Sequence, residues 1–371
     1  MVEKTNGKRI VWLDIARCFA ILSISSNHAI NRAFRSVGSS YDAYVSLPHI
    51  DSILRAVIFV FSRLGAPIFL MISGALLLEK KMDNSEDFRK FYKHNLLSIL
   101  ITSEIWYFLM FWYRTLLGSN DILKSGGVLL AIKRCIETML FINQETMGNM
   151  WYIPMILCVY LIIPVLNIAL HKVDSKLFVI PMVIVILSSM VFPNINQVNE
   201  ITGGEILIDF NLRSANIFSM YLIYVLLGYF ARQGAFKCIP DTSLILLLIL
   251  FFVACCVFQY WEYSIPGEHD VKYDFTLLAL SCVLIFETIR RFTNEQPQRA
   301  GITYISKISF GVFFVHVFIV SALAAIAPLS GMNRIAVFVV YEIVSVVGSI
   351  VIIYILSKIK LFKKYLFLIK D

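Results

Sequence analysis

Charged residues are scarce in this chain of 371 residues. Asp, Glu, Lys and Arg together make up only 16% of it, whereas soluble domains carry about 25%. Hydrophobic residues make up 58%, and the mean hydropathy is +0.76. The core of a protein of this size cannot bury so much apolar surface, so lipid must cover the rest. The composition therefore excludes an ordinary soluble globule, a disordered chain and a nucleic-acid-binding protein.

Motifs that carry soluble enzyme chemistry are also missing. The sequence has no P-loop, no HExxH, no GxSxG and no GxGxxG after a strand. A nucleotide hydrolase, a metalloprotease and an α/β-hydrolase are therefore unsupported. The seven cysteines include no CxxC pair, so we expect neither a metal site nor a disulfide framework.

Ten stretches are long and apolar enough to cross a hydrocarbon layer of about 30 Å as helices. We therefore predict an all-α fold, a polytopic membrane helix bundle of about ten transmembrane helices that forms one domain over residues 1–371. The stretches are residues 10–30, 52–78, 95–113, 150–170, 177–193, 215–233, 242–261, 273–292, 304–324 and 335–358.

The net charge of +8 records orientation rather than affinity for an acidic partner. If the N-terminus is cytoplasmic, the inner segments hold 21 Lys and Arg residues and the outer connections hold 9. Loops rich in Lys and Arg stay in the cytoplasm. We therefore expect both termini inside, which agrees with an even number of spans.

A few ionisable side chains fall inside the predicted spans, where each costs at least ~2.5–3.5 kcal/mol and is a functional candidate by default. Arg17 and His28 lie eleven residues apart, close to three helical turns, so they share a face about 16 Å apart along the axis. Asp14, three residues before Arg17, can pair with it. The candidates deep in the spans are Asp14, Arg17, His28, Arg63, Glu104, His316 and Glu342.

This face of the first span suits a long, bipolar substrate. Imidazole serves as a general base or covalent relay near neutral pH, and guanidinium binds phosphate or carboxylate. A substrate with phosphates at one end and a transferable group at the other fits the spacing. The structural alternative is that Asp14 and Arg17 form a neutralised pair near the inner interface, while His28 is hydrogen-bonded near the outer one.

Three further positions carry the same ambiguity. Arg63 precedes Gly65 and Pro67, which allow a kink whose freed N–H groups suit an anion; the alternative is a packing kink with a snorkelling arginine. Trp151 opens the fourth span, where an interfacial aromatic belt is the other interpretation. His316 lies within the ninth span, where a hydrogen-bonded core histidine is the commoner outcome.

Together these segments resemble the acyltransferase-3 family of integral membrane acyltransferases. They follow the family order over nearly the whole chain. The second segment has one arginine where some members carry an RxxR pair, and Phe313 and Phe314 precede His316 where a tyrosine is common. The segments are residues 13–17 with His28, residues 63–74, residues 150–154 and residues 308–316.

The resemblance implies an enzyme that moves an acetyl or other short acyl group from acyl-CoA to a hydroxyl of a cell-surface polysaccharide or lipid-linked sugar. It implies a bacterial inner or plasma membrane, acyl-CoA as a substrate, and no bound cofactor or metal. His28, Arg17 and Asp14 are the expected catalytic residues. The expected substrate- or CoA-binding residues are Arg63, Ser73, Trp151, His316 and Glu342.

Two other classes of protein share the buried charges. One is a transporter or flippase of a surface glycan or its precursor, which would use the charges as a substrate path. The other is a membrane-embedded sensor or partner subunit. Neither would transfer an acyl group, so an assay for transfer separates them from the enzyme.

Overall fold

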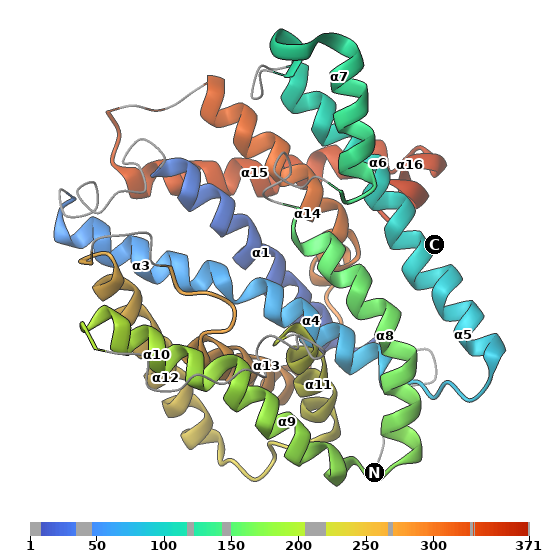
Figure 1. Cartoon of the computed structure of the whole chain (residues 1–371), viewed down its shortest axis with the longest axis vertical. Helices are drawn as coiled ribbons and strands as arrows, with labels where there is room; N and C mark the ends of the chain where they lie inside the picture. The colour runs from blue at the N-terminus through green and yellow to red at the C-terminus, as the bar shows by residue number, and fades with distance from the viewer. Residues whose placement is uncertain are drawn as a thin grey trace. The chain divides into compact units, whose positions relative to one another are not determined.

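The structure is a computed structural model that describes residues 9–34, 47–116, 122–142, 150–204, 220–265, 270–326, 329 and 331–369. These residues are helical with short connections and include no strand (Figure 1). The prediction of an all-α membrane helix bundle is confirmed. The principal helices are α1 (Val11–Ala33), α3 (His49–Arg63), α4 (Gly65–Leu77), α5 (Ser85–Phe91), α6 (Leu97–Leu116), α7 (Ile122–Met139), α8 (Tyr152–Lys172), α9 (Val179–Ile186), α10 (Phe192–Ile201), α11 (Met220–Gln233), α12 (Asp241–Glu262), α13 (Thr276–Thr293), α14 (Ala300–Ile326), α15 (Arg334–Leu356) and α16 (Lys360–Tyr365).

Seven helical segments of the described chain are long and apolar enough to span a membrane. The other three expected stretches coincide with α1, α11 and α13, although residues 215–219 of the sixth lie outside the described residues. The helical segment that matches the fifth expected stretch, residues 177–193, continues to Ile201. The count of ten crossings and the cytoplasmic termini stay predictions. The seven segments are His49–Leu77, Ser85–Leu116, Tyr152–Lys172, Lys176–Ile201, Asp241–Glu262, Ala300–Ile326 and Arg334–Leu356.

The helices form two compact units. The first unit comprises Met1–Lys81 and Ala169–Ser349, and the second comprises Met82–Ile168 and Ile350–Asp371. The first unit therefore contains α1, α3 and α4, all of the helices from α9 to α14, and most of α15. The second contains α5 to α7, most of α8, the end of α15 and α16. The catalytic candidates on α1 all belong to the first unit.

Helix α1 packs against α3, α4, α13 and α14 within the first unit. Its buried positions occur all round the helix and include Asp14 as well as Leu13 and Ile30. A helix that carries a carboxylate, a guanidinium and an imidazole cannot face lipid without a large cost. Enclosure by four neighbouring helices resolves that conflict.

Small residues and a broken turn bring the helices of this unit close together. A Cβ on Gly65 would lie 2.8 Å from Ile24 Cγ1, so only glycine fits where α4 begins beside α1. Between α3 and α4 the helix is interrupted at Leu64, and the Ser23 hydroxyl donates to the carbonyl of Phe61 at 2.7 Å. A serine from a neighbouring helix thus bonds a backbone carbonyl at the break, as intramembrane irregularities require.

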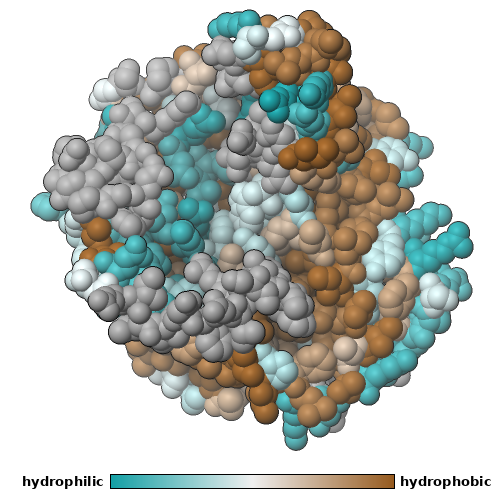
Figure 2. All heavy atoms as spheres, in the orientation of Figure 1, coloured by the Kyte–Doolittle hydropathy of each residue, from teal (hydrophilic) through white to brown (hydrophobic). Residues whose placement is uncertain are grey.

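Apolar side chains cover much of the surface in view in Figure 2. On α12, Leu246, Leu250, Val253 and Val257 are exposed at helical spacing. On α15, long apolar side chains such as Val347 are exposed in the same way. Exposed apolar faces of this kind are expected where lipid replaces water as solvent.

The second unit is held by hydrogen bonds between helices. Trp106 Nε1 donates to the Leu366 carbonyl at 2.9 Å, which ties α6 to the residue after α16. Tyr92 OH donates to the carbonyl of Leu161 at 3.1 Å. Tyr92 begins a π-helical turn, Tyr92–Leu96, that joins α5 to α6. Such turns occur often at functional positions.

Candidate functional site

A polar cluster surrounds Asp14 near the start of α1. The Asp14 side chain is only 2% exposed, and its Oδ2 lies 2.6 Å from Arg9 Nε. Its Oδ1 accepts from Arg17 Nη1 at 3.2 Å and from the Ser306 hydroxyl of α14 at 2.7 Å. Two arginines and a serine thus neutralise and hydrogen-bond one buried carboxylate, which is the condition for keeping it charged there. We call this set the Asp14 cluster.

The Asp14 cluster contains residues that sequence reasoning missed. The spacing indicated Arg17 as the partner of Asp14, and that pair exists, but the shorter bond comes from Arg9. Arg9 also lies near Ser306 Oγ at 3.2 Å. The signal was present, because Arg9 immediately precedes the first span, but the helical i,i+3 rule does not apply to a residue outside the helix.

A pair of histidines lies further along α1. The rings of His28 on α1 and His316 on α14 have centroids 5.1 Å apart. His316 is fully buried, and its Nδ1 lies 2.6 Å from the carbonyl oxygen of Val312. Because a carbonyl only accepts, Nδ1 carries the proton, and the neutral ring presents a lone pair at Nε2. That Nε2 has no hydrogen-bond partner among the described residues.

Glu342 of α15 joins the same end of α1. Its Oε1 lies within hydrogen-bond distance of the hydroxyl of Ser25 and 3.3 Å from that of Ser26. Its Oε2 is buried and has no hydrogen-bond partner in the described part of the chain. Ser25 precedes His28 by three residues, so both occupy one face of α1. The sequence singled out Glu342 without identifying a partner, and packing supplies the two serines.

Arg63 ends α3 beside aromatic rings and one carboxylate. Its Cζ lies 4.5 Å from the ring centroid of Phe59 and 5.4 Å from that of Tyr273. Its Nη2 is 3.8 Å from Asp270 Oδ2. Its Nε is buried and has no hydrogen-bond partner among the described residues. The guanidinium therefore keeps a donor for a further group.

The register of α3 against α1 fixes the level of Arg63. The hydroxyl of Ser62, the preceding residue, lies 3.2 Å from Asn27 Oδ1 on α1. Asn27 adjoins His28 and is ten residues, about 15 Å along the axis, from Arg17. Gly65, two residues after Arg63, faces Ala20 and Ile24 of α1. Arg63 therefore lies between the two levels, nearer the histidine end of α1 than the Asp14 cluster at the other end. We call His28, His316, Glu342 and Arg63 the histidine cluster.

The remaining candidates lie apart from these two clusters. The Ser73 hydroxyl donates to the Phe69 carbonyl of its own helix at 3.0 Å. Trp151 lies just before α8 in the second unit, with its ring 6.0 Å from that of Tyr152. Glu104 lies on α6 of the second unit. Of the eight residues predicted from the sequence to be catalytic or to bind substrate, six lie in the first unit on α1 or on the helices α3, α14 and α15.

One buried arginine was not singled out by the sequence. Arg55 is 4% exposed, and its guanidinium lies over the rings of Phe34, Phe59 and Tyr263, at 4.7 Å from the last centroid. Phe59 is four residues from both Arg55 and Arg63, so the three side chains follow one face of α3. The charge at Arg55 was visible, but its aromatic surroundings come from other helices.

No group of three or more His, Cys, Asp or Glu side chains that could hold a metal ion occurs among the described residues. What the arrangement offers is acid–base and charge chemistry at the two ends of a buried helix. The model of the acyltransferase domain family, acyltransferase-3, matches residues 10–354, which include the histidine cluster and all of the Asp14 cluster except Arg9. The chain belongs to the acyltransferase-3 family.

Family membership makes the protein a membrane acyltransferase with an acyl donor and an acyl acceptor. The resemblance inferred from the sequence is thereby confirmed. No curated protein and no solved structure matches the chain.

Proposed function

We propose that this acyltransferase moves an acetyl or other short acyl group from acyl-CoA to a hydroxyl of a cell-surface polysaccharide or lipid-linked sugar. The observation that carries the proposal is the histidine cluster, in which His316, Glu342 and Arg63 each keep one buried polar atom without a partner in the described chain. An unpartnered buried polar group costs about 1–3 kcal/mol. A substrate that binds these atoms would recover that cost.

In the proposed reaction His28 is the general base. Its imidazole takes the proton of the acceptor hydroxyl while the oxygen attacks the thioester carbonyl carbon. The tetrahedral intermediate then collapses with cleavage of the carbon–sulfur bond, and the leaving CoA sulfur takes the proton from the imidazolium. An acyl-histidine intermediate is the alternative route, in which His28 is itself the nucleophile.

We assign supporting roles in this step to Arg63 and His316. Arg63, which lies nearer to the histidine end of α1 than to Asp14, would stabilise the oxyanion through its Nε–H. His316 would accept a hydrogen bond at Nε2 from the acceptor or from His28. Glu342 would bind the acceptor through Oε2, and Trp151 and Ser73 remain weaker candidates for substrate contact.

The Asp14 cluster suits the donor. We propose that Arg17, oriented by Asp14, binds a phosphate of CoA on the cytoplasmic side, because the charge asymmetry predicts that this end of α1 lies inside. The 16 Å between Arg17 and His28 would then separate the phosphates from the acyl group. We further propose that both units form one integral membrane domain in a bacterial inner or plasma membrane, since the family match runs through both.

The test is acyl transfer by the purified protein from radiolabelled acetyl-CoA to membrane glycan. Replacing His28 with Ala should lower the rate by about 10²–10⁴-fold, as loss of a general base does. His49, an exposed residue that contacts Tyr260 at 3.0 Å, provides the matched control. His49→Ala should transfer at the wild-type rate. Transfer by His28→Ala at that same rate would overturn the assignment.

Label that stays on the protein through rapid gel filtration at neutral pH, in the absence of glycan, would distinguish the two routes. Direct transfer leaves the protein unlabelled, whereas the covalent route traps an acyl group on His28 that His28→Ala removes. No transfer to any acceptor, with glycan export lost when the gene is deleted, would instead support a transporter.

A further inference from the structure

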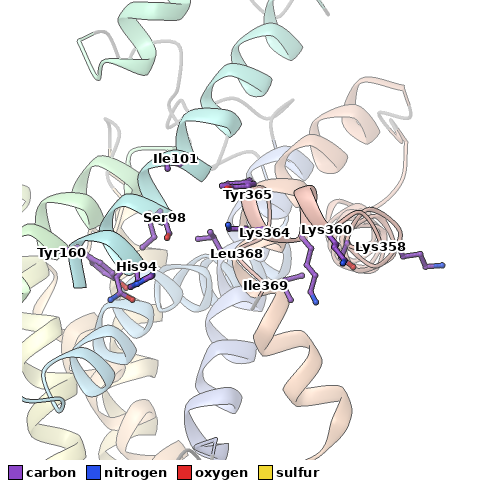
Figure 3. Close-up of a pocket in the computed structure, with 14 residues that line it drawn as sticks. His94, Ser98, Ile101, Tyr160, Lys358, Lys360, Lys364, Tyr365, Leu368 and Ile369 are labelled. Atoms are coloured by element: carbon purple, nitrogen blue, oxygen red, sulfur yellow. The ribbon is translucent and has the colours of Figure 1, made fainter. Parts of the chain in front are cut away.

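The second unit contains a pocket of about 860 Å³ (Figure 3). Its walls come from the π-helical turn and first turns of α6, from Tyr160 of α8 and from the chain beyond residue 356. The lining residues are His94, Asn95, Ser98, Ile99, Ile101, Tyr160, Ser357, Lys358, Lys360, Lys363, Lys364, Tyr365, Leu368 and Ile369.

The pocket is strongly basic. Four of its fourteen lining residues are lysines that fall within seven positions of the sequence, and none is Asp or Glu. In Figure 3 the side chain of Lys358 extends away from the other labelled residues, whereas Lys360 and Lys364 lie among them. Lys364 Nζ lies 4.9 Å from the ring centroid of Tyr365. The concentration of positive charge selects an anionic ligand.

An apolar wall accompanies the lysines. Ile99 and Ile101 of α6 line one part of the pocket, and Leu368 and Ile369 line another. Ile101 is exposed on a helix long and apolar enough to span the membrane. A small soluble anion needs only the charges. The adjoining isoleucines and leucine suit a ligand that carries a hydrocarbon chain beside its charge.

The two segments that meet here belong to the same predicted side of the membrane. Residues 80–93 and 358–370 each hold five Lys or Arg residues, and both are inner segments in the charge count. The two segments are more than 260 residues apart in the sequence. The pocket is nevertheless lined both by His94 and Asn95, which directly follow the first segment, and by lysines of the second segment. The cytoplasmic leaflet is the one that carries anionic lipids, and basic pockets between helices on this side bind phosphate headgroups.

We propose that this pocket binds the phosphate headgroup of an anionic phospholipid of the cytoplasmic leaflet. Lys360, Lys363 and Lys364 surround the phosphate, His94 and Asn95 donate hydrogen bonds from the π-helical turn, and an acyl chain lies against Ile101. The site is distinct from the catalytic residues, all of which belong to the first unit.

The experiment titrates fluorescent phosphatidylglycerol into the purified full-length protein in neutral detergent, with phosphatidylcholine as the uncharged comparison. A juxtamembrane lysine contributes about a fivefold gain in affinity. The triple variant Lys360→Gln, Lys363→Gln, Lys364→Gln should therefore bind phosphatidylglycerol on the order of a hundredfold more weakly. Phosphatidylcholine binding should not change between the two proteins.

The matched control removes three inner-side lysines outside the pocket, in the variant Lys172→Gln, Lys176→Gln, Lys237→Gln. It should lose less than about fivefold, the effect of one contacting lysine. An equal loss in both triple variants would show a diffuse electrostatic effect and overturn the pocket. The corresponding triple Lys→Arg variant should restore binding, which separates loss of charge from misfolding.

Competition distinguishes a lipid from a soluble phosphate. Free CoA and inorganic phosphate should not displace phosphatidylglycerol, and the triple Gln variant should bind CoA with wild-type affinity. If the triple Gln variant loses CoA binding instead, the pocket is a site for a soluble donor and the lipid assignment is wrong. Either result leaves the test of His28 unaffected, because that test measures transfer.

Discussion

Replacing Asp14 with Asn tests which arginine the buried carboxylate depends on. The Arg9 bond, at 2.6 Å, is the shorter, and the Arg17 bond, at 3.2 Å, is longer. A hydrogen bond to a charged group contributes about 1.5–3 kcal/mol. Because the Arg9 side chain is 31% exposed, solvent screening places its bond near the lower value, about 1.5 kcal/mol. The longer Arg17 contact contributes about 0.5 kcal/mol, as partly exposed pairs do.

The assay is a double-mutant cycle on the free energy of unfolding, measured by denaturant titration in mixed micelles. Asp14→Asn should cost about 2–3 kcal/mol in all, because the amide keeps one acceptor for Ser306 but loses the charge. The coupling between Asp14→Asn and Arg9→Gln should exceed that between Asp14→Asn and Arg17→Gln by about 1 kcal/mol.

CoA binding should depend on the two arginines in the opposite order, more on Arg17 than on Arg9. Arg17→Gln should weaken CoA binding more than it lowers stability, and Arg9→Gln should lower stability more than it weakens CoA binding. A coupling with Arg17 equal to or larger than that with Arg9 would refute the inference that Arg9 is the main partner. The outcome matters because it decides which of the two arginines mainly holds the carboxylate and which mainly contacts the donor.

Three further outcomes follow from the packing. Gly228→Ala should destabilise the protein by about 1–3 kcal/mol, because a Cβ there meets the backbone of Met71 on α4, whereas Gly301→Ala, with open space around it, should be neutral or stabilising in the same unfolding titration. His316→Asn keeps a donor for the Val312 carbonyl and removes the ring Nε2. The kcat should therefore fall about tenfold, the value of one lost hydrogen bond, while the free energy of unfolding stays unchanged. An unchanged kcat would leave His316 a purely structural residue. Arg63→Lys should lower kcat and leave the Kd of CoA unchanged in calorimetry, and a weakened Kd would place Arg63 with the donor.

Much of the first unit could be predicted from the sequence. Helical spacing predicted that Asp14 and Arg17 pair, and the structure places Arg17 Nη1 at 3.2 Å from the carboxylate. The interruption near Gly65 was also expected, and α3 and α4 meet at Leu64. Both features depend on neighbours within one turn, where the geometry of the helix sets the distance.

Other features needed the packed structure. Arg63 could equally have joined Arg17 or His28, and its level is set by contacts between helices such as that of Ser62 with Asn27. The two serines beside Glu342 could not be inferred either, since α15 and α1 are separated by some 300 residues. Contacts between helices depend on which faces meet and in what register, and a single sequence fixes neither.

The sequence by itself determined the solvent and the helical secondary structure, because a low charge content and apolar stretches of about 20 residues indicate helices covered by lipid. The motifs along the chain, rather than its composition, indicated the family. The tertiary structure alone decided which buried charges meet. Asp14 pairs with Arg9 and accepts a hydrogen bond from Ser306. The ring of His28 lies beside that of His316, and the C-terminal lysines line a pocket together with His94. The rise along a helix is local and can be counted, whereas the approach of two helices is settled by the packing of all their side chains.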